Sequence, residues 1–70
     1  AYMSKLINDL VGKQCIIRSE FIFSFAGKTE LSCKIIDADD EWIKICYTEK
    51  KDKQVVKLMR IENIESIEEQ

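Results

Sequence analysis

The 70-residue sequence contains no histidine and no proline, only two glycines, and three cysteines without a CxxC pair. Without histidine, the chain lacks the side chain that most often acts as a general base. Two isolated glycines exclude a glycine-rich phosphate-binding loop. Because no other catalytic or metal-binding motif is present, we expect a non-enzymatic protein with no cofactor, no metal and no small-molecule substrate.

The three cysteines, Cys15, Cys33 and Cys46, are widely spaced and odd in number. Such a set does not form a disulfide framework or a zinc site, so we expect small apolar side chains in strands. No apolar run approaches the roughly 20 residues of a membrane-spanning helix, and no signal-peptide pattern is present. We therefore expect a cytoplasmic protein without a membrane partner.

The net charge of −2 argues against strong, non-specific binding to nucleic acid, because attraction to phosphate scales with basic charge. This net charge is compatible with a small basic patch on the surface. A chain this short buries only about 60% of its unfolded surface, so it gains stability by association.

Residues 31–47 carry the clearest structural signal. Apolar and polar residues alternate on both sides of an acidic segment, which is typical of two half-buried strands joined by a turn. Ile36 and Trp42 fall on the opposite phase, where Trp42 can anchor a subunit contact. The inward positions are Leu31, Cys33, Ile35, Ile43, Ile45 and Tyr47.

The acidic segment, residues 37–41, is predicted to be a solvated turn. A calcium-binding EF-hand loop needs glycine at its sixth position and glutamate at its twelfth. Counted from Asp37, those places hold Trp42 and Thr48, so the calcium motif is absent.

Residues 4–11 are predicted to form a short helix. Ser4 can cap its N-terminus, and Gly12 can adopt the left-handed conformation that ends a helix. A helix this short is unstable alone, so we expect it to cover one open end of the core.

Residues 13–25 are predicted to form a long first strand, because side chains of one phase run from Cys15 to Phe25. Its aromatic end, FIFSF, supplies either core and subunit contacts or a platform on which single-stranded nucleic acid stacks its bases. The small number of neighbouring cations favours the first interpretation.

The remaining sequence predicts a hairpin tip and two strands. Residues 48–53, TEKKDK, are charged, and their lysines are either solvated or in contact with phosphate. Residues 54–61 are predicted to form a strand that is apolar and therefore buried on both faces, and a short last strand near Ile67 precedes a frayed polar tail. The predicted core is Ile17, Leu31, Ile35, Ile43, Ile45, Leu58, Ile64 and Ile67.

Together these elements predict one mainly β domain over residues 1–70, in which a short helix precedes a strongly bent antiparallel sheet of five strands over residues 13–67. This plan resembles the small β-barrel of the Sm-like family. The segments LINDLVGKQCII, CKIIDADDEWIKI and VKLMRIENIESI are similar to the N-terminal helix, the Sm1 hairpin and the Sm2 motif. SH3-like and Tudor-like barrels share the same alternation.

The resemblance implies a homo-oligomeric ring that binds RNA weakly, because Sm-like proteins form rings and often bind RNA. Asp39 matches the Sm1 aspartate, and Arg60 matches the Sm2 arginine, although Ile61 replaces the following glycine. The expected RNA contacts are Asp39, Lys44, Lys57 and Arg60. The expected subunit contacts are Val55, Val56, Met59, Ile61, Ile67 and Trp42.

A second class of function remains open. An SH3-like or Tudor-like domain would bind proteins and have no nucleic-acid role. In that case Phe21, Phe23 and Trp42 would form the apolar docking surface.

Overall fold

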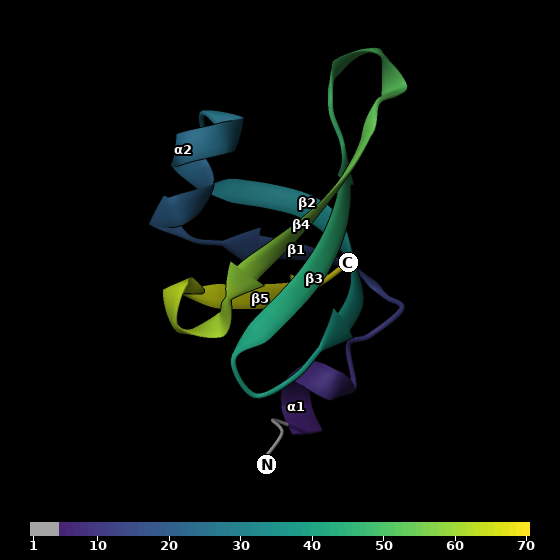
Figure 1. Cartoon of the computed structure of the whole chain (residues 1–70), viewed down its shortest axis with the longest axis vertical. Helices are drawn as coiled ribbons and strands as arrows, with labels where there is room; N and C mark the ends of the chain where they lie inside the picture. The colour runs from purple at the N-terminus through teal and green to yellow at the C-terminus, as the bar shows by residue number, and fades with distance from the viewer. Residues whose placement is uncertain (1–4) are drawn as a thin grey trace.

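A computed structural model describes residues 5–70 as one antiparallel sheet with short helices in its connections (Figure 1). The strand order is β4-β3-β2-β1-β5, so the last two strands of the sequence form the two edges. The predicted mainly β class is confirmed. The strands are β1 (Gln14–Arg18), β2 (Glu30–Ala38), β3 (Trp42–Thr48), β4 (Gln54–Arg60) and β5 (Ser66–Glu69). The helices are α1 (Lys5–Asn8), α2 (Phe23–Ala26) and the 3₁₀ turns η1 (Glu20–Ile22), η2 (Lys50–Asp52) and η3 (Ile61–Asn63).

The sheet is strongly bent, as the sequence predicts. In Figure 1, β1, β2 and β5 run across the view, whereas β3 and β4 rise steeply over them. The pairing of β2 with β3 moves from Ile35↔Ile45 to Asp37↔Lys44, which leaves Ile36 as an extra residue. Such a bulge bends its strand and increases the local twist. Because β2 continues through the bulge to Ala38, the turn begins two residues later than predicted.

The core lies on the inner face of the bent sheet. Five of the eight predicted core residues are buried: Ile17, Leu31, Ile35, Ile43 and Ile45. Ile64 and Ile67 are half-buried and pack against this cluster. Leu58 was predicted wrongly, since it is 54% exposed, and Met59 is buried in its place.

The orientation of β4 follows from its pairing with β3. Met59 lies opposite the buried Ile43, and Leu58 lies opposite the exposed Lys44. Neighbouring residues in a strand point to opposite faces, so the partner strand decides which phase enters the core. The prediction that β4 is buried on both faces is therefore also wrong, because Val56 is 59% exposed.

The predicted long strand over residues 13–25 is wrong beyond Arg18. The chain turns at Ser19 into η1 and α2, which place Ile22 in the core and pack Phe25 and Ala26 against it. These three residues have the i, i+3, i+4 spacing of a helix rather than the alternation of a strand. Gly27 ends α2 with a φ of 73°, a left-handed conformation that glycine adopts at little cost.

Ser19 is the one buried polar side chain in the described residues, and it links four segments. Its hydroxyl donates to the carbonyl oxygen of Asn63 at 2.6 Å and accepts from the N–H of Phe21 at 3.1 Å. Its own N–H donates to the carbonyl of Thr29 at 2.9 Å. The strand ends here because the side chain caps the first turn of a helix.

The two ends of the chain also differ from the prediction. Helix α1 covers Lys5–Asn8 and continues as turns, and its predicted cap, Ser4, lies outside the described residues. The predicted frayed tail is wrong, because β5 runs to Glu69 and the N–H of Gln70 donates to the carbonyl of Gln14 at 3.0 Å.

Replacing Ser19 should destabilise the protein. Ser19→Ala removes a helix cap and leaves the carbonyl of Asn63 without its donor, which together cost about 1–3 kcal/mol. Urea unfolding followed by circular dichroism measures this. Ser24→Ala is the matched control, because Ser24 is exposed, and it should stay within about 0.5 kcal/mol. Equal effects of the two substitutions would contradict the role of Ser19.

Replacing Ile45 tests the position of the core. Ile45→Ala should lower the free energy of unfolding by about 2–5 kcal/mol, because it opens a cavity at a fully buried site. That is a large part of the stability of a small domain. Leu6→Ala, at an 81% exposed site, is the control and should unfold like the wild type. An unchanged midpoint for Ile45→Ala would show that the inward phase of β3 is misassigned.

Candidate nucleic-acid interface

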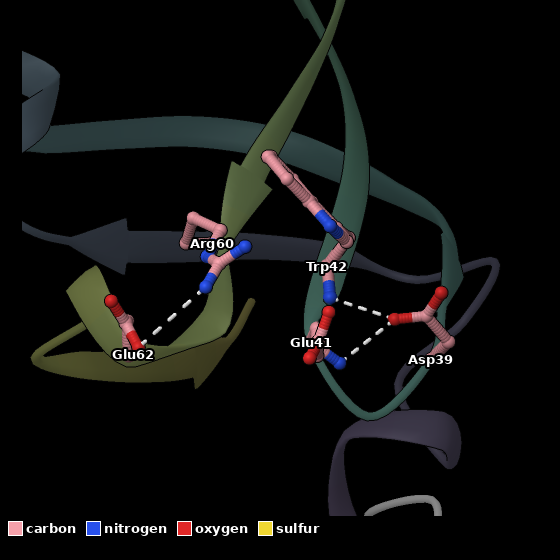
Figure 2. A network of polar contacts seen from close by, with 5 residues as sticks. All are labelled: Asp39, Glu41, Trp42, Arg60 and Glu62. Carbon is pink, nitrogen blue, oxygen red and sulfur yellow. Dashed lines mark hydrogen bonds and ion pairs between the residues drawn. The ribbon is translucent and has the colours of Figure 1, made fainter. Parts of the chain in front are cut away.

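The turn between β2 and β3 lies beside the end of β4 (Figure 2). The N–H of Ile61 donates to the carbonyl oxygen of Glu41 at 2.9 Å, which ties the two segments together. Trp42 and Arg60 are opposite each other in the ladder of β3 and β4. The turn after β2 and the end of β4 therefore meet at one end of the sheet.

Asp39 holds this turn in shape. Its Oδ1 accepts from the N–H groups of Trp42 at 2.7 Å and Glu41 at 2.8 Å, as Figure 2 shows. These backbone donors, Trp42 first, lower the pKa of the Asp39 carboxyl because they favour its charged form. The oxygen that makes these bonds is thus committed to the backbone, which gives Asp39 a structural task.

Arg60 stacks on Trp42. Its guanidinium carbon lies 5.1 Å from the centre of the indole ring, within the range of a cation–π contact. One Nη atom of Arg60 also lies 4.0 Å from a carboxylate oxygen of Glu62 (Figure 2). Both side chains of this ion pair are substantially exposed, so the pair adds little stability.

The structure brings three of the four predicted RNA contacts to one region. Asp39 and Lys44 line the same shallow hollow of about 120 Å³, together with Trp42, and Arg60 lies on that tryptophan. Lys57 lies elsewhere. It shares the phase of Met59, and its Nζ lies 4.0 Å from the centre of the Phe25 ring.

The charge of this region is negative. We call residues 37–44 and 60–62 the acidic end, because they hold five carboxylates and only two cations, Lys44 and Arg60. Clustered carboxylates oppose the approach of phosphate groups, whose binding is dominated by basic charge. The acidic end therefore brings three of the predicted RNA contacts together without the positive charge that RNA binding needs.

The predicted subunit contacts differ in how far they are exposed. Val56 is 59% exposed and Trp42 is 38% exposed, both on the outer face of the sheet. Val55, Ile61 and Ile67 are half-buried, and Met59 is committed to the protein's own core. Leu58, which the sequence suggested for the core, is an exposed apolar residue beside Val56 on β4.

The predicted docking residues of the alternative function fall into two groups. Phe21 and Phe23 are 45% and 62% exposed and belong to η1 and α2. Trp42 begins β3, and Figure 1 shows that end of β3 and α2 toward opposite ends of the molecule. The three side chains therefore do not form one surface.

A second hollow, of about 410 Å³, was not predicted. We call it the aromatic hollow; it lies between α2, the start of β2 and the end of β3, and Phe25, Lys28, Leu31, Tyr47 and Lys50 are among its lining residues. Burial, then the charge of Glu49, raises the pKa of the Tyr47 phenol, which favours its neutral form. In each of the two segments, aromatic and basic residues are close together in the sequence, which is a signal for this hollow. That the two segments meet is visible only in the structure.

The cysteines behave largely as expected. Cys15 and Cys33 are buried, Cys46 is half-buried, and all three are free. Burial, then the neighbouring thiols, raises the pKa of Cys33 to about 12, which keeps it an unreactive thiol. Across the part of the chain that the structure describes, no group of three Cys, Asp or Glu side chains could hold a metal ion. None of the helices within residues 5–70 has the length and apolar character that a membrane crossing requires.

Comparison with known proteins identified no relative. No family model, no curated protein and no solved structure matches the chain.

The pKa of Asp39 predicts a pH-dependent contribution to stability. A carboxyl whose pKa is lowered by folding stabilises the protein above about pH 4, and that contribution is lost as the pH falls further. Asp39→Asn should therefore melt below the wild type at pH 7, and the difference should shrink toward pH 2. Thermal melts across this range measure it.

Asp40→Asn is the matched control for this experiment, because it makes the same substitution at an exposed position of the same turn. It should leave the melting temperature unchanged. A difference between wild type and Asp39→Asn that is the same at every pH would contradict the assignment.

Proposed function

We propose that this protein is a non-enzymatic Sm-like module of the cytoplasm that assembles with copies of itself and binds RNA weakly. The observation that carries the proposal is the strand order, which leaves β4 at one edge of the sheet and β5 at the other. Free strand edges recruit another strand, because their outward N–H and C=O groups lack partners.

The two edges differ, which favours a head-to-tail contact between copies. An edge-to-edge contact of β4 with the β5 of the next copy is heterologous, and such contacts close into rings when the rotation between copies allows. In a heterologous contact, the two copies meet through different surfaces. This arrangement agrees with the ring that the resemblance to Sm-like proteins implies.

Charge and apolar surface support the same contact. β4 and the residue before it carry Lys53, Lys57 and Arg60, whereas the segment of β5 carries Glu65 and Glu68. Opposite charges on two surfaces steer their association and fix its register. The exposed Val56 and Leu58 on β4 add apolar area that a neighbouring copy would cover.

The RNA-binding part rests on the resemblance and on basic residues that are grouped rather than scattered. Free thiols support the cytoplasmic assignment, since disulfides are rare there. Weak binding fits the net charge of −2.

Native mass spectrometry at micromolar concentration tests the assembly. We expect a species at a multiple of 8.2 kDa, and we expect its abundance to fall as salt is raised, because exposed charge pairs are screened. A single 8.2 kDa species at every concentration would end the proposal of self-assembly.

A charged substitution on β4 tests whether this strand forms the contact between copies. Val56→Glu should yield monomers with an unchanged circular dichroism spectrum, because it places a carboxylate on the outer face of β4. Leu6→Glu introduces the same charge at an 81% exposed site on neither edge strand and should assemble normally. Assembly that survives Val56→Glu would exclude the β4 edge as the contact.

The alternative, an SH3-like or Tudor-like protein-interaction domain, draws support from the exposure of Phe21 and Phe23. A monomer in native mass spectrometry that also binds no RNA would favour it.

A further inference from the structure

The aromatic hollow joins two sequence features that are far apart in the chain. One is the aromatic segment FIFSF, and the other is the basic hairpin TEKKDK between β3 and β4. Phe25 of α2 and Lys50 of the hairpin both line the hollow. Figure 1 shows α2 and this hairpin toward the same end of the molecule, away from α1.

The wall of the hollow is an ordered aromatic cluster. The ring centres of Phe25 and Tyr47 are 5.8 Å apart, and those of Phe25 and Phe21 are 6.1 Å apart in an edge-to-face arrangement. Both distances are typical of favourable aromatic pairs. Phe25 is half-buried, so the cluster holds it in place while part of its surface faces the hollow.

Cations surround this cluster. Lys28 and Lys50 line the hollow, and the ammonium group of Lys57 lies over the Phe25 ring at 4.0 Å from its centre. We call residues 25–28 and 47–57 the hairpin end; it holds five lysines against two carboxylates, Glu49 and Asp52. The net charge of the hairpin end is thus opposite in sign to that of the acidic end.

We propose that the aromatic hollow binds single-stranded nucleic acid, with a base packed against Phe25 beside Tyr47 and phosphates next to Lys28, Lys50 and Lys57. Proteins that bind single strands combine aromatic surfaces for bases with cations for the backbone. The inference rests on the RNA-binding part of the proposed function and moves it from the acidic end to the hairpin end.

Charge complementarity selects this ligand. Phosphates provide the negative charge that the lysines attract, and a planar base fits a hollow with an aromatic wall. An acidic peptide would satisfy the lysines but would leave the aromatic wall without a matching group. The proposal therefore predicts that binding depends on both the cations and the aromatic face.

Fluorescence anisotropy with labelled oligo-U and oligo-dT at low salt tests the proposal. Lys28→Gln/Lys50→Gln should weaken binding about tenfold and reduce the dependence of log affinity on log salt by about 0.7 for each lost phosphate contact. Binding of either oligonucleotide supports the proposal, and a difference between the two measures the combined effect of the 2′-hydroxyl and the thymine methyl group.

The matched control is Lys5→Gln/Lys44→Gln, which removes the same charge from residues outside the hairpin end. It should bind like the wild type. Phe25→Leu tests the aromatic face, because it keeps apolar volume but removes the ring, and it should weaken binding severalfold. Circular dichroism and native mass spectrometry check that every variant folds and assembles as the wild type does.

The fluorescence of Trp42, the single tryptophan, tests the location of the binding site in the protein without any substitution. Trp42 belongs to the acidic end, so its emission should stay constant when an unlabelled oligonucleotide binds at the hairpin end. Quenching of Trp42 together with loss of binding in Lys5→Gln/Lys44→Gln would overturn the location and leave RNA binding intact. Equal competition by polyglutamate would overturn the base contact.

Absence of binding by both oligonucleotides would overturn this inference and the RNA-binding part of the proposed function together. Self-assembly is measured by mass and would stand or fall separately.

Discussion

The hydrogen bonds of the buried Ser19 hold the segments of this small fold in their arrangement. A buried hydroxyl must find hydrogen-bond partners, because an unsatisfied polar group costs about 1–3 kcal/mol. Ser19 finds them in the capped turn of η1 and in the loop before β5, and its N–H bonds the connection into β2. β1 therefore stops at Arg18, and α2 packs at the far end of the sheet. The same bonds hold the loop that leads β5 to the side of β1.

The sheet order and the charge pattern follow from that arrangement. With β5 beside β1, β4 has only β3 as a neighbour, and the two edges carry charges of opposite sign. The chain also separates its charges between two ends, because carboxylates gather in the turns after β2 and β4 and lysines gather around the hairpin after β3. A molecule with a net charge of −2 can thus present a local surface that attracts phosphate.

The proposed self-assembly and the proposed nucleic-acid site use different surfaces. Assembly would cover the outer edge of β4, where Val56 and Leu58 are exposed, whereas the aromatic hollow opens between α2 and the end of β3. Lys57 connects the two, because it lies on the edge strand and its ammonium contacts Phe25. Repetition of a weak site around an assembly would raise the overall affinity for a long strand, since linked sites bind with high effective concentration.

The pattern of apolar and polar residues was sufficient to predict the fold class and most of the strands. Alternation fixed the inward phase of the β2–β3 hairpin, because one face of a half-buried strand must be apolar, and Ile35, Ile43 and Ile45 are buried as predicted. The same alternation could not determine which side chains of β4 point inward, because residues 55–59 are apolar at four of five positions. Pairing with β3 places Met59 in the core and leaves Leu58 outside it. The sequence could not show that Ser19 would find a partner 44 residues away in Asn63, which ended the first strand. The aromatic hollow, too, exists only in the tertiary structure, because local patterns carry no information about which distant segments meet.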